Sequence, residues 1–370
     1  MPLDLLGIDA SRATSDRKTG TEWYSREIIR AIAALEDRPA LRLYQRGPVR
    51  FLDAPNVESV EVKRRRFWTH AGLALELRRS HVDALFVPSH VIPWRHPGVT
   101  VVTIHDLGYR FEPGAHTLQR RAMLEATTRW NARRASRIIV PSATTRSDLE
   151  TQYGVDPVKV DVIPHGVDHE RFQPMNCDEI DRHLETIGVR QPYILFVSTI
   201  QPRKNLARLV SAFESLARPD LKLVIAGTDG WKAGPTLARI EASSVRDSII
   251  RLGYVADEAM PALYNGAKAL VFPSLYEGFG MGVLEAMACG CPVVTSSVSS
   301  LPDVAGDAAI IVDPTSVREI GDGIRQALDP AVTSHLIAKG LERASGFTWD
   351  RAAQRTLDVI GRAYADAGGR

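Results

Sequence analysis

The stretch ALVFPSLYEGFGMGVLEAMACGCPVVT (residues 269–295) contains, in order, the elements of one parallel α/β unit. Residues 269–273 and 292–295 are short, continuous apolar runs, which predict two buried strands. Between them, a glycine-containing loop leads into a helical pattern that begins near Met281. Free backbone N–H groups in the first turn of such a helix bind anions, and glycine lets a phosphate approach the backbone closely. We therefore expect an α/β fold with an anion site at this turn.

The same alternation of apolar runs and longer helical patterns continues along the 370-residue chain. The predicted strands are residues 3–9, 41–45, 84–88, 99–104, 137–141, 160–164, 193–197, 222–227, 249–253, 269–273, 292–295 and 309–312. Continuous apolar strands separated by helices are typical of parallel sheets with both faces covered. Because these strands exceed one comfortable sheet, and domains usually have about 100–200 residues, we predict two doubly wound, Rossmann-like domains.

The predicted boundary lies in the polar stretch 165–179, which follows a strand and contains Pro174. This places an N-terminal domain at residues 1–175 and a second domain from residue 176. Ligands of doubly wound sheets bind beyond the carboxyl ends of the strands, so the expected site is a cleft between the two domains.

Composition excludes several classes of protein. The three cysteines are too few for a disulfide framework and favour a reducing compartment. No secretory leader and no apolar run of about 18 residues is recognisable, so we expect no membrane-spanning segment. The net charge of +2 argues against nucleic-acid binding. Residues 1–150 nevertheless hold 24 Lys/Arg against 17 Asp/Glu, so an anionic partner is expected on that half.

Two glutamates, Glu277 and Glu285, flank the glycine loop. Glu285 cannot hold a phosphate, because like charges repel, but a carboxylate suits a neutral diol such as a ribose. Glu277 suits the hydroxyls of a second sugar, or a developing positive charge. Together with the anion site, these groups indicate a nucleotide-sugar, although solvated glutamates on a surface helix remain an alternative. A dinucleotide-binding G-x-G-x-x-G motif is excluded by Val283.

Two cations, Arg203 and Lys204, follow a predicted strand and Pro202. Adjacent cations at this position suit a leaving diphosphate, because bond breaking builds negative charge on its oxygens. The alternative is a solvated basic turn. His105, at the end of another strand, and Gly20, before a helix at residues 21–36, are further candidates, each against an ordinary structural role.

The quoted stretch resembles the nucleotide-sugar motif of the retaining GT-B glycosyltransferases of group 1 (glycosyltransferase family four). YILFVSTIQPRKNLARLVSAF (193–213) is similar to the phosphate-binding segment of that family. GIDASRATSDRKTGTEWYSREII, VVTIHDLGYRFEP and SSLPDVAGDAAIIVDP follow the order found in the family. The resemblance covers about 340 residues.

The resemblance implies a GT-B fold: two Rossmann-like, doubly wound parallel-sheet domains facing across a cleft. It also implies that a C-terminal helix within residues 347–370 completes the first domain, which leaves 176–346 as the nucleotide-sugar domain. The implied activity is metal-independent hexosyl transfer from a nucleotide diphosphate sugar, without any cofactor. The implied acceptor is a hydroxyl of a glycan or lipid-linked molecule in cell-surface polysaccharide biosynthesis.

Residue by residue, the motifs transfer two sets of roles. The expected catalytic residues are His105, Glu277, Arg203 and Lys204. The expected donor-binding residues are Gly20, Ser198, Thr199, Arg203, Lys204, Tyr254, Val255, Glu277, Gly278, Phe279, Gly280, Met281 and Glu285. The chain departs from the family pattern at Met281-Gly282, where Leu-Pro is frequent. It also departs at Ser198-Thr199, where Gly-Arg is frequent, and this puts a phosphate contact of Thr199 in doubt.

A basic cluster at Arg64, Arg65, Arg66 and Trp68 suits an anionic acceptor or an acidic membrane surface, with a solvated strand edge as the alternative. We therefore expect a cytoplasmic protein, with contact at the inner face of the membrane as a further possibility. Mannose from GDP-mannose is the preferred donor, because the motif style resembles bacterial mannosyltransferases. A UDP-sugar-dependent glucosyl-type transferase and a nucleotide-sugar-binding module without transfer activity remain alternatives.

Overall fold

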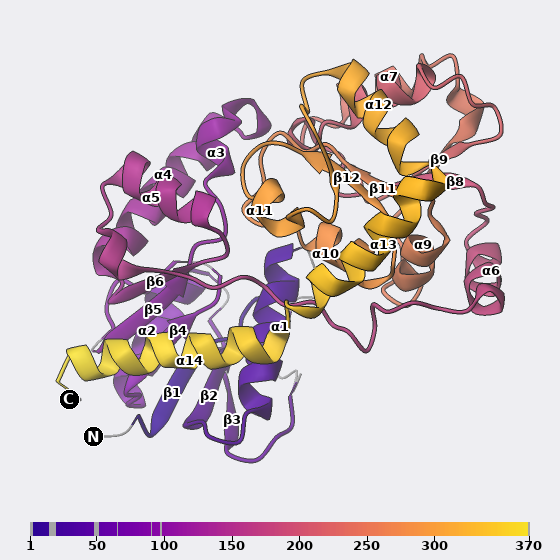
Figure 1. Cartoon of the computed structure of the whole chain (residues 1–370). Helices are drawn as coiled ribbons and strands as arrows, with labels where there is room; N and C mark the ends of the chain where they lie inside the picture. Colours follow the sequence, from indigo (N-terminus) through magenta and orange to yellow (C-terminus); the bar gives the residue numbers. More distant parts are fainter. Residues whose placement is uncertain are drawn as a thin grey trace. The chain divides into compact units, whose positions relative to one another are not determined.

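The computed structural model describes residues 3–14, 20–47, 52–64, 66–89, 91–96 and 98–368, which form two α/β units (Figure 1). Unit 1 comprises Met1–Leu107, Gln119–Gly166 and Thr348–Arg370, and unit 2 comprises Gly108–Leu118 and Val167–Phe347. The main division, between Gly166 and Val167, lies inside the polar stretch 165–179. At Gly166 an added Cβ would lie 2.3 Å from the backbone nitrogen of Trp349, so the segment after β7 and the start of α14 are in close contact there.

Unit 1 is built on a seven-stranded sheet in the order β3-β2-β1-β4-β5-β6-β7, and its described pairings are all parallel. The strands are β1 (Leu5–Asp9), β2 (Ala40–Gln45), β3 (Val57–Glu61), β4 (Ala84–Val87), β5 (Val99–Thr103), β6 (Arg137–Val140) and β7 (Val160–Val162). The sequence pattern predicted all of these except β3. This edge strand, VESVE, has no continuous apolar run, and none of its five residues is fully buried.

Up to Gly166 the chain forms the helical elements α1 (Gly20–Ala34), η1 (Trp68–Leu73), α2 (Ala74–Arg79), α3 (Gly108–Phe111), η2 (Pro113–Ala115), α4 (Leu118–Arg134), α5 (Ala143–Tyr153) and η3 (Pro157–Lys159). The C-terminal helix α14 (Trp349–Asp366) joins unit 1 from the end of the chain. Local chemistry explains several ends: Ser142 accepts a hydrogen bond from the Thr145 N–H at the start of α5, and Gly154 ends it with φ 63°.

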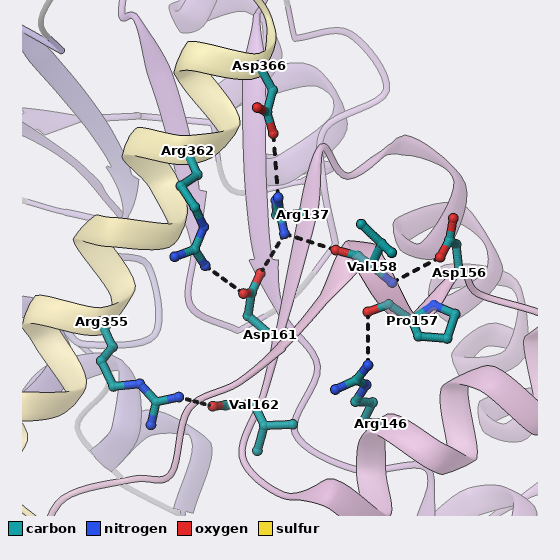
Figure 2. Close-up of polar contacts among 10 residues, drawn as sticks. All are labelled: Arg137, Arg146, Asp156, Pro157, Val158, Asp161, Val162, Arg355, Arg362 and Asp366. Atoms are coloured by element: carbon teal, nitrogen blue, oxygen red, sulfur yellow. Dashed lines mark hydrogen bonds and ion pairs between the residues drawn. The ribbon is translucent and has the colours of Figure 1, made fainter.

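Helix α14 belongs to unit 1 although it is the last element of the chain (Figure 1). Its buried face, which includes Ala353 and Ile360, lies in the same apolar core as Ile8 of β1 and Ile28 of α1. Polar contacts between α14 and β7, at the edge of the sheet, add to this packing (Figure 2). The Arg362 guanidinium donates to Asp161 Oδ1 at 2.7 Å, and Arg355 donates to the Val162 carbonyl at 2.7 Å.

Unit 2 is built on a six-stranded parallel sheet in the order β10-β9-β8-β11-β12-β13. The strands are β8 (Tyr193–Val197), β9 (Lys222–Ala226), β10 (Ile249–Gly253), β11 (Ala269–Phe272), β12 (Val293–Ser296) and β13 (Ile310–Val312). The helical elements are α6 (Cys177–Thr186), η4 (Pro202–Lys204), α7 (Leu206–Glu214), α8 (Gly234–Glu241), η5 (Arg246–Ser248), α9 (Met260–Gly266), α10 (Met281–Ala288), α11 (Leu301–Ala305), α12 (Val317–Ala327) and α13 (Pro330–Ser345).

Both faces of this second sheet are covered. Leu195 and Leu270 lie in one apolar cluster with Leu284 of α10, whereas the alternate strand residues Ile194 and Val271 lie in a separate cluster. The chain order of the strands reverses between β8 and β11, which are neighbours. In such sheets the loops at this reversal separate to either side and leave room for a ligand. The segments after β8 and β11 carry most of the predicted donor-binding residues, and Tyr254 and Val255 follow β10.

Candidate active site

The loop between β11 and α10 takes its shape from Gly280. This residue caps α10 with φ 115°, in the left-handed region, and an added Cβ would lie 2.7 Å from Leu301 Cδ2. The positive φ requires glycine at this position, and a larger residue would also displace the Leu301 side chain. Gly282, two residues on, is less constrained, because an added Cβ would lie 3.4 Å from the hydroxyl oxygen of Tyr264.

Glu277 lies in this loop and is 8% exposed. Its carboxylate faces both predicted cations: Lys204 Nζ lies 2.5 Å from Oε1, and Arg203 Nη1 lies 3.3 Å from Oε2. Burial would raise the pKa of Glu277, but the charges of Lys204 and Arg203 outweigh burial and hold the pKa below its usual value. The structure thus brings together three of the four residues predicted to be catalytic, with Glu277 ionised.

The two cations are held by the turn η4 and by Asn205. Arg203 Nη1 also donates to the Tyr276 carbonyl at 2.6 Å, and the Arg203 carbonyl accepts from the Leu275 N–H at 2.8 Å. Asn205 is buried with φ 62°, and its side-chain amide donates to the carbonyls of Pro273 and Pro314 at 2.9 and 2.7 Å. Asparagine tolerates this backbone region, so its position after Arg-Lys was a clue that the sequence analysis did not use.

Glu285 lies in α10 and has a different partner. Tyr264 of α9 donates its hydroxyl hydrogen to Glu285 Oε2 at 2.8 Å. Burial raises the pKa of Glu285, and the Tyr264 hydrogen bond and the Arg171 charge only partly offset this effect. Tyr264 is fully buried, so it fixes the direction of the Glu285 side chain. The sequence analysis missed Tyr264, because its position in an apolar helix reads as core.

The other predicted donor residues of unit 2 lie at the same edge of its sheet. The backbone at Ser198 is packed so closely that an added Cβ at Gly227 would lie 1.9 Å from the Ser198 carbonyl oxygen. The Gly227 N–H donates to the Gly253 carbonyl at 2.7 Å, which ties the ends of β9 and β10 together. Tyr254 directly after β10 is 63% exposed, and its neighbour Val255 is half-buried. Thr199, Gly278, Phe279 and Met281 lie in the segments that follow β8 and β11.

His105 belongs to unit 1, where it follows β5. Its Nε2 lies 2.9 Å from the Pro88 carbonyl oxygen, which can only accept, so Nε2 carries the hydrogen. Burial lowers the pKa of His105, although the Pro88 bond and the Asp106 charge oppose this shift. The ring is therefore neutral near pH 7, with Nδ1 as a hydrogen-bond acceptor.

Three further aromatic rings surround His105. The rings of Tyr24 and His165 lie 4.7 and 5.6 Å from it, and the Trp349 ring lies 6.2 Å from that of His165. Burial and the neighbouring His105 lower the pKa of His165 well below its usual value. Gly20, the remaining candidate of unit 1, is the exposed first residue of α1.

The basic cluster of unit 1 differs in detail from the expectation. Arg64 and Arg66 are exposed, and Arg65 lies outside the described residues. Trp68 is only 2% exposed and lies under the Arg46 guanidinium, 5.3 Å from the ring centroid, whereas its neighbour Phe67 is 70% exposed. The aromatic side chain available at this surface is therefore Phe67.

Comparisons with known proteins follow the same division of the chain. The family model described as glycosyltransferase family 4 matches residues 19–171, and the model described as glycosyl transferases group 1 matches residues 178–339. The O-antigen chain mannosyltransferase B of Escherichia coli is 30% identical over 368 residues, which cover 92% of this chain and 95% of that protein. The chain belongs to the group 1 glycosyltransferases. It is therefore an enzyme, as the sequence motifs predicted.

Solved structures confirm the GT-B fold of this glycosyltransferase. Sucrose-phosphate synthase from Thermosynechococcus elongatus superposes with a TM-score of 0.81 at 20% identity, over 98% of this chain and 100% of that one. HepE of Anabaena, solved in complex with UDP and glucose, superposes with a TM-score of 0.74 at 18% identity, over 97% and 99% of the two chains. At these identities the likeness concerns the fold.

The described residues hold no group of three or more His, Cys, Asp and Glu side chains that could bind a metal ion. Within the same ranges, no helix has both the length and the apolar character needed to cross a bilayer.

Proposed function

We propose that this glycosyltransferase moves mannose from GDP-mannose to a hydroxyl of a glycan or lipid-linked acceptor, with retention at the anomeric carbon. The observation that carries the proposal is the buried carboxylate of Glu277, which contacts Lys204 and Arg203 on the loop that leads into α10. The similarity to an O-antigen mannosyltransferase over nearly the whole chain supports the choice of mannose and of a polysaccharide acceptor.

Lys204 and Arg203 are assigned to the diphosphate of the donor. Cleavage of the bond from sugar to phosphate builds negative charge on the leaving oxygens, and cations already in place stabilise it. One such group typically contributes ~3 kcal/mol to lowering the barrier. The side chains of Arg203 and Lys204 are 14% and 12% exposed, so their charges act in a poorly solvated environment. Ser198, Gly20 and the N–H groups at the start of α10 are assigned to the same diphosphate.

Glu277 is assigned to the donor sugar. Because its pKa is held low, the ionised carboxylate accepts hydrogen bonds from sugar hydroxyls and stabilises positive charge that develops at the anomeric carbon. In the free protein the same carboxylate pairs with both cations and offsets one of their two positive charges. A bound diphosphate takes over part of that pairing, and this frees acceptor capacity on Glu277 for the sugar.

Glu285 is assigned to the ribose of the nucleotide. Its pKa is raised by burial, and hydrogen bonds donated by a diol favour the ionised carboxylate, so ribose binding is expected to lower this pKa. The backbone at Tyr254 and Val255 is assigned to the edge of the base. His105 contributes its Nδ1 acceptor to a hydroxyl of the donor sugar, whereas the role of His165 is to pack against it.

A UDP-sugar is the second candidate donor. It is favoured by the superposition on HepE, which was solved with UDP and glucose. The residues assigned above hold ribose, diphosphate and hexose, and these parts are common to both donors. These residues therefore do not distinguish GDP-mannose from a UDP-sugar. A direct comparison of turnover with the two donors identifies the base and the sugar.

We also propose peripheral contact of unit 1 with an acidic membrane surface, where a lipid-linked acceptor would be presented. Lys63, Arg64 and Arg66 are exposed, and Phe67 offers an apolar ring beside them. Basic residues near an anionic bilayer contribute ~1 kcal/mol each. Trp68 is assigned to supporting this segment from below, since its ring is buried.

The test is donor turnover without acceptor, followed by NMR. We expect slow release of mannose from GDP-mannose as the α-anomer first, because the donor is α-linked and transfer to water retains configuration. Release should persist in EDTA and should be lost in Glu277→Gln. First appearance of the β-anomer would contradict retention. Faster turnover of UDP-glucose than of GDP-mannose would replace GDP-mannose as the proposed donor. Binding of both donors with turnover of neither would favour a binding module.

A further inference from the structure

Four hydroxyl side chains of β12 and the loop after it bond the backbone of the loop that carries Glu277. Thr295 donates to the Phe272 carbonyl at 3.1 Å, and Ser296 donates to the Ser274 carbonyl at 2.7 Å. These two contacts anchor the last residue of β11 and the start of the loop that follows it. The chain then reaches Ser299 and Ser300, which contact Glu277 itself.

Ser299 and Ser300 bond both polar groups of the Glu277 backbone. The Glu277 N–H donates to Ser299 Oγ at 2.9 Å. The Ser300 hydroxyl lies 2.9 Å from the Glu277 carbonyl oxygen and 2.8 Å from that of Phe279, so its one hydrogen is shared between them. Ser300 is fully buried. Glu277 lies in a loop, where no strand or helix pairs its backbone groups. The hydroxyls of Ser299 and Ser300 supply the partners of both groups.

The backbone of Ser299 indicates that its hydroxyl is needed. Its φ is 55°, in the left-handed region that favours glycine. Glycine at this position would remove the strain but would leave the Glu277 N–H without its acceptor. A serine retained in this conformation is explained by the hydrogen bond that it accepts.

We propose that Ser299 and Ser300 are positioning residues for Glu277. They fix the backbone from which the Glu277 carboxylate reaches Lys204 at 2.5 Å and Arg203 at 3.3 Å, and so they set where the donor sugar meets that carboxylate. This inference rests on the proposed function, in which Glu277 binds the sugar and Glu285 binds the nucleotide. It predicts that the serines affect the sugar and leave the nucleotide unaffected.

The experiment compares Ser299→Gly, Ser299→Ala and Ser300→Ala with wild type. Turnover is measured with GDP-mannose and UDP-glucose in parallel, and affinity for GDP and UDP is measured by calorimetry. We expect kcat to fall on the order of 10- to 100-fold in all three variants, because displacing a reacting group by a fraction of an ångström is costly. Affinity for the free nucleotide should not change.

Ser299→Gly separates positioning from folding. It removes the hydroxyl and relieves the backbone strain, so its Tm should equal or exceed that of Ser299→Ala while both lose turnover. The matched control is Ser316→Ala, because Ser316 Oγ accepts from the Glu319 N–H at 3.2 Å in the same unit, at the start of α12. It should lower Tm and leave kcat unchanged.

The possible outcomes distinguish this inference from the proposed function. Full kcat in Ser299→Gly and Ser300→Ala, with Glu277→Gln inactive, would overturn the positioning role alone. Equal loss of nucleotide affinity and turnover would also overturn it, because the effect would then be on the whole site. Full activity in Glu277→Gln, or no turnover of either donor by wild type, would overturn both.

Discussion

Lys204 Nζ lies 2.5 Å from Glu277 Oε1, although the two residues are 73 positions apart in the chain. Arg203 faces the other carboxylate oxygen at 3.3 Å, so each oxygen has its own cation. Removing one partner of a buried ion pair typically costs ~3–5 kcal/mol, because the remaining charge stays buried. One carboxylate faces two cations, so this group of three side chains keeps a net positive charge.

Lys204→Ala should slow turnover more than it weakens donor binding. The charge of Lys204 matters most when the phosphate leaves, and we expect kcat to fall on the order of 100- to 1,000-fold. The measurement is kcat and KM for the donor, with Tm to follow stability. Lys268→Ala, an exposed lysine of the same unit, is the control. Equal kcat in Lys204→Ala and wild type would exclude the assigned role.

Glu285→Ala should weaken the binding of GDP. A ribose diol loses a charged acceptor, which typically costs ~1.5–3 kcal/mol, or roughly a 10- to 100-fold loss of affinity. Calorimetry with GDP and UDP measures the change. Glu241→Ala serves as control, because the Glu241 side chain is 60% exposed and pairs with Arg246. An unchanged dissociation constant for GDP would contradict the assignment of Glu285 to the ribose.

Asp9→Asn should remove a pH dependence of stability from unit 1. Burial raises the pKa of Asp9 to about 6, although hydrogen bonds from Ser11 and the charges of Arg46 and Arg12 oppose the shift. The folded protein then holds a proton that the unfolded chain has already released, so unfolding free energy falls as pH rises from about 4 to about 7. A shift from 3.8 to about 6 corresponds to ~3 kcal/mol.

Urea unfolding at pH 4 and pH 7 measures this effect. The difference in unfolding free energy between Asp9→Asn and wild type should move in favour of the variant by ~3 kcal/mol over that range. Asparagine keeps an oxygen for the Ser11 N–H, which donates to Asp9 Oδ1 at 3.0 Å. The same pH dependence in both proteins would refute the buried, protonated state.

Replacement of Arg64 and Arg66 by alanine should weaken binding to acidic vesicles. Two basic residues at ~1 kcal/mol each correspond to roughly 30-fold in partitioning. Sedimentation with phosphatidylserine vesicles measures the loss, and Phe67→Ser should weaken binding further through its exposed ring. Arg190→Ala with Arg318→Ala, two exposed arginines of unit 2, is the matched control. Unchanged sedimentation of the unit 1 variants would leave the cluster as a solvated surface.

Asp161→Ala should loosen the attachment of α14 (Figure 2). Asp161 accepts from Arg362 at 2.7 Å and from Arg137 at 3.4 Å, and we expect a loss of ~1–3 kcal/mol in unfolding free energy. A double-mutant cycle with Arg362→Ala isolates the pair. Additive effects of the two substitutions would show that the Asp161–Arg362 pair contributes no coupling energy to the attachment of α14.

Much of the fold could be predicted because its strands are buried on both faces. Runs such as 193–197 and 269–273 are apolar throughout, and this pattern is readable in sequence. Strand β3 was not predicted, because an edge strand need not be apolar. The turn η4, where Arg203 and Lys204 lie, was expected as a loop, since three residues give no periodic pattern.

The sequence by itself determined the parallel α/β class, the glycine turn at Gly280 and the identity of the charged groups, because each follows from local pattern and backbone chemistry. Only the tertiary structure decided that Glu277 pairs with Lys204, that Ser299 and Ser300 hold its backbone, and that Trp68 is buried. The physical reason is that these contacts join segments distant in the chain. Their partners are chosen by how the strands are ordered in the sheet and by which loops thereby become neighbours.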